Sequence, residues 1–118
     1  YPHQNKKLYD ILNNAVVLRG YEICKKIPCE YRKYDGNSFG MKWHVDDEMM
    51  KKSYYEAILT VHNTSANRFE YVLNNKTYSI KPKPNMLILI KPKNIWHRSS
   101  PLHYGSRRFL KFILEKKT

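Results

Sequence analysis

Hydrophobic and polar positions divide the chain into two parts with different periods. In residues 4–18 the apolar side chains recur at spacings of three and four, which predicts an amphipathic helix; they are Leu8, Ile11, Leu12, Ala15 and Val16. Gly20 is suited to end this helix. From residue 21 to residue 114 the pattern changes to short, often alternating runs that are typical of β-strands. The pattern therefore predicts one helix followed by a β core.

Nine short segments of this core are predicted to be strands: 21–25, 29–34, 41–46, 55–62, 68–73, 76–81, 86–90, 95–99 and 107–114. Asn74 and Asn75 separate two alternating runs and predict a tight hairpin. Pro82 and Pro84 exclude a central strand at their position and lead into the apolar run 86–90. We therefore predict a mainly β protein, a double-stranded β-helix (jelly roll) with the N-terminal α-helix packed on the sheet.

Length and composition set limits on this prediction. The chain has 118 residues, which favours a single domain over 1–118, with the helix at 4–18 and the β core at 21–114. No apolar run approaches the ~20 residues of a membrane span. Cys24 and Cys29 lack the spacing of a zinc ribbon. We interpret both as reduced thiols, which favours a reducing intracellular compartment.

The formal net charge of +12 points to an acidic partner, such as nucleic acid. The lysines are spread along the chain and form no single basic block. This distribution fits an ordinary solvated surface as well as a nucleic-acid interface. The charge is therefore compatible with a nucleic-acid partner but does not by itself imply one.

The candidate chemistry lies in three pieces read together. His44-Val45-Asp46 is followed by His97 after 53 residues and by Arg107 ten residues later. Two imidazoles and one carboxylate are the ligand set of a mononuclear non-haem Fe(II) site with open positions. An arginine presents a planar fork that can pair with a carboxylate of a co-substrate. We expect His44 and Asp46 to share one face of strand 41–46, and His97 to come from the opposite sheet.

The segments around these residues resemble a known family. Residues 34–46, Tyr-Asp-Gly-Asn-Ser-Phe-Gly-Met-Lys-Trp-His-Val-Asp, are similar to its Tyr-x-Gly-Asn and His-x-Asp run. Residues 97–107, His-Arg-Ser-Ser-Pro-Leu-His-Tyr-Gly-Ser-Arg, resemble its His-x-x-x-Pro-x-x-x-Gly-x-Arg run with the spacing intact. The family is the prolyl and lysyl hydroxylase branch of the Fe(II)- and 2-oxoglutarate-dependent dioxygenases, and the resemblance covers roughly residues 28–114.

This resemblance implies a fold, a reaction and a set of residue roles. The fold is a double-stranded β-helix. The reaction uses O2 and couples the decarboxylation of 2-oxoglutarate to the hydroxylation of a protein or peptide side chain. Among such side chains, prolyl is the first expectation. Ascorbate is an accessory reductant in this expectation. Carried over, His44, Asp46 and His97 are the catalytic iron ligands. Arg107 binds the far carboxylate of 2-oxoglutarate, and Tyr34 lines the same pocket.

The chain departs from the family pattern at Val61 and Lys111, and the adjacent Arg108 leaves the choice of the anchoring arginine open. Val61 aligns with a tyrosine that often supports the co-substrate, so that role falls to another residue or is absent; the candidates are Tyr54, Tyr55 and Thr60. Arg108 would replace Arg107 as the anchor if the last strand were shifted by one residue. Lys111 lies on the same strand face as Arg107 and either approaches the substrate or extends outward.

Two other functions remain open. The stretch from Tyr34 through His44-x-Asp46 to Glu48 also resembles oxidative nucleic-acid demethylases, which the charge would suit. Against them, Ile113 occupies the position where those enzymes usually carry a second arginine. A non-catalytic, cupin-like metal-binding module is the third possibility. Two further histidines, His62 and His103, are interpreted as structural or solvated.

Overall fold

The computed structural model describes residues 18–46, 52–91 and 95–117, and these residues form nine strands and no helix. The strands are β1 Tyr21–Ile23, β2 Glu30–Asp35, β3 Met41–His44, β4 Tyr54–Asn63, β5 Phe69–Leu73, β6 Lys76–Ile80, β7 Leu87–Ile90, β8 His97–Ser99 and β9 Ser106–Lys116. Each overlaps one of the nine predicted segments, so the prediction of a mainly β protein is confirmed. The predicted helix 4–18 lies, except for Leu18, outside the described residues.

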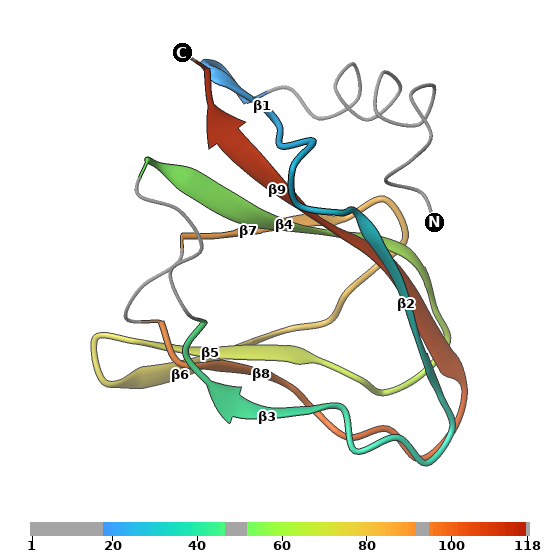
Figure 1. The fold of residues 1–118 in the computed structure, drawn as a ribbon. Coiled ribbons are helices and arrows are strands. Elements are labelled where there is room, and N and C mark those ends of the chain that lie inside the picture. Colours follow the sequence, from blue (N-terminus) through green and yellow to red (C-terminus); the bar gives the residue numbers. More distant parts are fainter. Residues whose placement is uncertain (1–17, 47–51, 92–94, 118) are drawn as a thin grey trace.

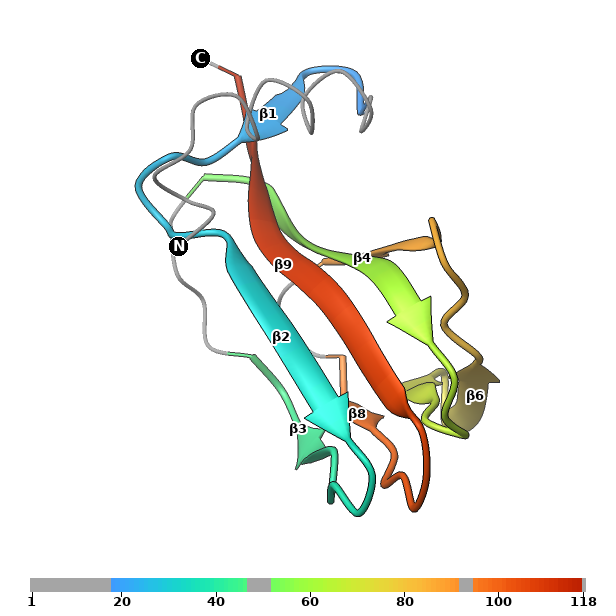
Figure 2. The same ribbon diagram turned by 90° about the vertical axis from the view of Figure 1, so that its right-hand side faces the viewer.

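The strands form two antiparallel sheets that face each other (Figure 1). The larger sheet has the order β1-β9-β4-β7, and β2 also pairs with β9, further along the same edge as β1 (Figure 2). The smaller sheet has the order β3-β8-β5-β6. The two antiparallel sheets form a β-sandwich, an arrangement consistent with the predicted jelly roll.

Alternation along β4 and β9 explains how the large sheet buries both of its faces. Glu56 and Ile58 point to the inner side with Phe109, while Ala57 points to the outer side and packs with Phe112. Because strand residues alternate between faces, each face presents its own row of side chains; the outer row is apolar, and the inner row combines apolar residues with polar ones such as Glu56. Fully burying a phenylalanine side chain contributes roughly 1.5–3 kcal/mol, so these rows hold the sheet in place on both sides.

Positive φ angles mark two turns, and the first of them confirms a predicted hairpin. Asn74 and Asn75 have φ angles of 51° and 63° and join β5 to β6, as the predicted hairpin requires. Gly40, at the entrance to β3, has a φ of 67°, and a Cβ atom there would overlap the carbonyl oxygen of Ser99. Only glycine combines this backbone conformation with such a close approach. Gly40 therefore allows the start of β3 to lie directly against the end of β8.

Two further expectations bear on the class of protein. Cys24 and Cys29 are free thiols, each only 1% exposed, in agreement with their interpretation as reduced residues. Within the described part of the chain, no helix has the length and apolar character needed to cross a bilayer.

Candidate metal centre

The cluster of metal-binding side chains forms where β3 ends and β8 begins. His44 is the last residue of β3 and is the register partner of His97, the first residue of β8. The two imidazole rings lie 4.3 Å apart between centroids. The expectation that His97 comes from the opposite sheet is therefore wrong, because β3 and β8 are neighbours in the same sheet.

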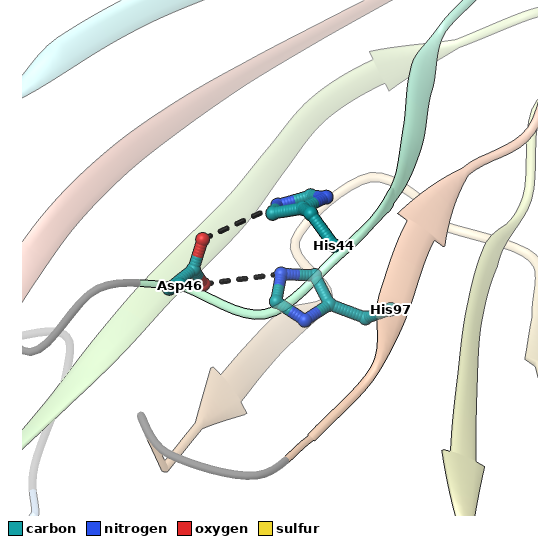
Figure 3. A group of neighbouring side chains, drawn as sticks. All are labelled: His44, Asp46 and His97. Atoms are coloured by element: carbon teal, nitrogen blue, oxygen red, sulfur yellow. Dashed lines mark ion pairs between the residues drawn. The ribbon is translucent and has the colours of Figure 1, made fainter.

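Asp46 completes the cluster from beyond the end of β3. Its Oδ1 lies 3.2 Å from His44 Nε2, and its Oδ2 lies 3.1 Å from His97 Nε2 (Figure 3). The predicted strand 41–46 was thus too long by two residues. The physical reason is that β8 begins at His97, so β3 has no partner beyond His44 and the chain is free to turn Asp46 toward both rings.

Backbone contacts fix which nitrogen each histidine presents. Nδ1 of His44 lies 2.6 Å from the carbonyl oxygen of Lys42, and Nδ1 of His97 lies 2.9 Å from that of Ile95. A carbonyl oxygen only accepts, so each Nδ1 must carry the proton and donate it. Each Nε2 is then the nitrogen that faces the cluster, which is the usual way in which a protein orients histidine ligands to a metal.

The donor set fits a divalent transition metal such as Fe(II). One ligand atom from each of His44, Asp46 and His97 lies within 4.8 Å of the other two. The sequence prediction that these three residues come together is therefore met, and His62 and His103 are not part of the group. Two imidazole nitrogens and one carboxylate oxygen from three residues leave further coordination positions for a bidentate ligand and a small molecule.

The electrostatics of the cluster keep Asp46 ready to act as a ligand. Burial raises the pKa of the Asp46 carboxyl, but its hydrogen bonds to His97 and Glu56 outweigh burial and hold the pKa below its ordinary value. For His97, burial lowers the pKa, and the hydrogen bond to Asp46 outweighs it and raises the pKa. Asp46 is therefore a carboxylate at neutral pH, which is the form that binds a metal.

Arg107 lies on the inner face of β9 in the same cavity. Its side chain is only 1% exposed, whereas Arg108 points to the exposed side. Nη1 donates to Oδ1 of Asn67 at 3.0 Å and to Oγ of Ser99 at 3.3 Å. The guanidinium carbon lies 4.4 Å from the centre of the Phe109 ring. The strand register thus places Arg107, and not Arg108, toward the cluster.

Two nitrogens of the Arg107 guanidinium are left without a partner. Among the described residues, neither Nε nor Nη2 has a hydrogen-bond acceptor, and no carboxylate forms an ion pair with this guanidinium. Burial lowers the pKa of Arg107 to about 10, so the group remains a cation at neutral pH. A buried, half-satisfied guanidinium is costly unless an anion reaches it. An anion that reached this side chain would therefore satisfy both unpaired nitrogens.

Tyr34 and Thr60 are two further residues for which a role near the co-substrate was expected. Tyr34 is the register partner of Arg107 on β2 and lines the cavity, as expected. Thr60 points to the inner side of β4, is 1% exposed and has an unpaired hydroxyl among the described residues. Of the candidates for the missing tyrosine, Thr60 has the orphaned polar atom that such a role needs.

Sequence reasoning missed Glu56, Asn67 and Ser99. Glu56 is 3% exposed on the inner face of β4, where Lys111 approaches its Oε1 at 3.5 Å. Lys111 therefore faces the cavity and does not extend outward. Burial, followed by the hydrogen bond to Asp46, raises the pKa of Glu56 to about 7. A charged residue at a core-facing position of an apolar strand was the signal that could have identified Glu56.

Comparison with known proteins supports the fold. No protein-family model and no curated relative matches the sequence. The structure is similar to the crystal structure of a prolyl-4-hydroxylase from Pseudomonas putida, with a TM-score of 0.62 and 12% identity. The match covers 76% of this chain and 52% of the hydroxylase chain, so it spans about half the length of that protein. The chain thus has the same β-sandwich fold as a prolyl-4-hydroxylase and carries a His-Asp-His group suited to a metal.

Proposed function

We propose that this chain is a jelly-roll, Fe(II)- and 2-oxoglutarate-dependent dioxygenase domain that hydroxylates a side chain of a protein or peptide, in the manner of prolyl hydroxylases. The observation that carries the proposal is the pairing of two features in one cavity. His44 and His97 line it beside Asp46, and the buried Arg107 lines it with two unpaired nitrogens, Nε and Nη2. A metal site alone would not require a buried cation that lacks an anionic partner.

The residues that would hold iron are His44, Asp46 and His97. Bound there, Fe(II) would supply the activation of O2 that is coupled to decarboxylation of a 2-oxo acid. The protein contributes the orientation of both imidazoles through the carbonyl groups of Lys42 and Ile95. It also keeps Asp46 ionised, so that the three donors carry a single negative charge toward a dication.

The residues that would hold 2-oxoglutarate start with Arg107. Its free Nε and Nη2 can donate two parallel hydrogen bonds to one carboxylate, the bidentate geometry that arginine favours. Asn67 and Ser99 occupy Nη1 and so fix the orientation of the fork. The unpaired Thr60 hydroxyl on the same inner face offers a further donor to that carboxylate. Tyr34 covers the cavity next to Arg107.

A polypeptide substrate is better supported than a nucleic acid. Ile113, at the position where oxidative demethylases usually carry a second arginine, is 2% exposed and packs with Cys24 and Tyr54. It therefore leaves no cation there for a nucleotide phosphate. The neighbouring fold, that of a bacterial prolyl-4-hydroxylase, also favours a peptide.

The proposal is tested by measuring succinate release and product mass. The purified chain is incubated with Fe(II), 2-oxoglutarate and ascorbate, together with either proline- and lysine-containing peptides or methylated oligonucleotides. We expect succinate formation and the gain of one oxygen on a peptide. Loss of a methyl group from the oligonucleotide, with no peptide oxidation, would replace this proposal with the demethylase. Metal binding with no 2-oxoglutarate consumption would instead identify a cupin-like binding module.

A further inference from the structure

A second and larger cavity lies between the inner faces of the two sheets. It is a groove of about 540 Å³, within the range of ~300–1,000 Å³ typical of ligand pockets. Phe69, Tyr71 and Leu73 of β5 form one wall, and Ile88 and Ile90 of β7 form the other. Among the described residues that line it, Lys91 alone is charged. The groove is therefore suited to apolar groups and lies between the sheet edges formed by β6 and β7.

The groove adjoins the cavity of the candidate metal centre. Phe69 and Ile90 line both cavities. A row of rings follows the inner face of the small sheet toward His97, with Tyr78 stacked on Tyr71 at 5.2 Å, Tyr71 6.1 Å from Phe69, and Phe69 5.7 Å from His97. Tyr78 is 42% exposed, so this row begins at the surface. A molecule that lies in the groove would thus have one end beside the metal ligands.

One wall of the groove is a free sheet edge. Within the described part of the chain, β7 pairs with β4 and with no other strand. Its sequence is Leu-Ile-Leu-Ile, and Leu89 is 37% exposed. Such an edge presents N–H and C=O groups that can pair with an added strand, and proteins usually protect it with charge or proline. The segment after β6 has this protection in Lys81-Pro82-Lys83-Pro84, whereas β7 itself does not.

We propose that an extended polypeptide adds as a strand to the free edge of β7 and places alternate apolar side chains in the groove. The backbone of such a strand would pair with the free β7 edge, and every second side chain would enter the apolar groove. Peptide recognition by β-strand addition combines these two kinds of contact. An acyl chain would fill the groove but leave the β7 backbone unpaired. A nucleic acid would bring phosphates to an apolar floor. Polypeptide is therefore the occupant that the geometry favours.

The lysines near the groove indicate which residues the added strand carries at its solvent-facing positions. Lys76, Lys81 and Lys83 are exposed in and after β6, and none forms an ion pair among the described residues. Because lysine side chains attract carboxylates, acidic residues are favoured at the positions of the added strand that face solvent. The partner is thus a segment in which apolar and acidic residues alternate. That this segment is also the substrate rests on the proposed function, together with the position of the groove next to the cavity of the metal ligands.

The first experiment measures binding of a defined probe by fluorescence anisotropy. The probe is a labelled peptide of alternating glutamate and valine, and its control carries N-methyl groups on alternate backbone amides. The full chain is used in EDTA and again with Mn(II), so no turnover is needed. We expect the probe to bind and the control to bind at least tenfold more weakly, since backbone hydrogen bonds contribute about 0.5–1.5 kcal/mol each. Equal binding of the two peptides would exclude strand addition.

Variants then locate the site. Leu73→Asp introduces a negative charge into the groove, and Leu89→Lys places a charge on the β7 edge; both positions are partly exposed, at 43% and 37%. Val61→Lys, at a 49% exposed position on β4 that does not line the groove, is the matched control. We expect at least tenfold weaker probe binding for the first two variants only, with unchanged melting temperatures. Full binding by both groove variants would overturn the proposal.

The remaining outcomes separate this proposal from others. If Leu89→Lys abolishes a dimer seen by sedimentation and the parent does not bind the probe, the groove is a self-association surface and the proposal is wrong. Arg107→Ala should stop 2-oxoglutarate consumption without changing probe binding. Probe binding without any turnover by the parent would therefore support the groove and reject the dioxygenase. Turnover without probe binding would support the dioxygenase and reject the strand-addition proposal.

Discussion

His44 and His97 are register partners in the antiparallel pair of β3 and β8, so one hydrogen-bonded pair of strands sets the distance between two candidate ligands. Each ring is held by a carbonyl group two residues earlier in the chain. Asp46 needs only a short turn beyond β3 to reach both. The centre therefore depends on local strand pairing, and its donors are oriented before any metal binds.

We expect the metal to stabilise the parent chain and to fail to do so in ligand variants. A metal at 100 times its dissociation constant adds about 2.7 kcal/mol to the free energy of unfolding. His97→Ala or Asp46→Ala should remove this increment, while His62→Ala, outside the cluster, should retain it. Thermal unfolding with and without Mn(II) measures the effect. Stabilisation of both ligand variants to the parental extent would show that the metal binds elsewhere.

Arg107→Ala should weaken 2-oxoglutarate binding strongly. Loss of one partner from a desolvated charge pair typically costs ~3–5 kcal/mol, which is a few hundred- to several thousand-fold in affinity. Arg108→Ala is the matched control, because Arg108 is the neighbouring residue on the exposed side of β9. Calorimetric titration of 2-oxoglutarate into the Mn(II)-loaded protein compares the two. A larger effect at Arg108 would contradict the register observed between β9 and β4.

Gly40→Ala should disturb the metal centre as well as the stability. Alanine at positive φ costs roughly 1–2 kcal/mol, and its Cβ would also overlap Ser99 O at the β3–β8 contact. Gly20→Ala is a sharp control, because Gly20 has a φ of 83° and nothing within 4 Å of the added atom. We expect Gly40→Ala to be the more destabilising variant and to bind Mn(II) more weakly. Similar unfolding free energies and metal affinities for both variants would contradict this account.

Much of the fold could be predicted because its signals are local. Alternation and apolar runs located all nine strands, and Asn74-Asn75 identified the hairpin from the need for positive φ. The candidate ligand residues could be found because their order and spacing match the runs of the family that the sequence resembles. The pairing of β3 with β8 could not be found in this way, because it depends on contacts between residues that are more than 50 positions apart.

The supporting residues of the cavity were harder to predict for the same reason. Asn67 holds Arg107 from a loop between β4 and β5, and an isolated asparagine has no motif that indicates a buried partner. Glu56 was more accessible to inference. It lies on the same face of β4 as Ile58, so the alternation that predicted the strand could also have indicated a buried carboxyl group.

Glu56→Gln should change the pH dependence of stability in the metal-free protein. Burial and the hydrogen bond to Asp46 raise the pKa of Glu56 from 4.5 to about 7 in the folded chain. Between these values the unfolded chain has lost a proton that the folded chain retains, so the free energy of unfolding falls as pH rises. Glutamine cannot ionise and removes this loss. The variant should therefore be more stable than the parent at pH 7, by about 3 kcal/mol at most, with no gain below pH 4.5.

Glu115→Gln gives the opposite sign and so makes the test specific. The hydrogen bond with Cys24, together with Lys52, lowers the pKa of Glu115 in the folded chain. A lowered pKa contributes stability above the unfolded value and loses it as pH falls, so this variant should be less stable than the parent at pH 7. Chemical unfolding in EDTA between pH 4 and pH 7 measures both differences. If Glu56→Gln lost stability relative to the parent as pH rose, the buried carboxyl would be held as an anion by Lys111 and would not share a proton with Asp46.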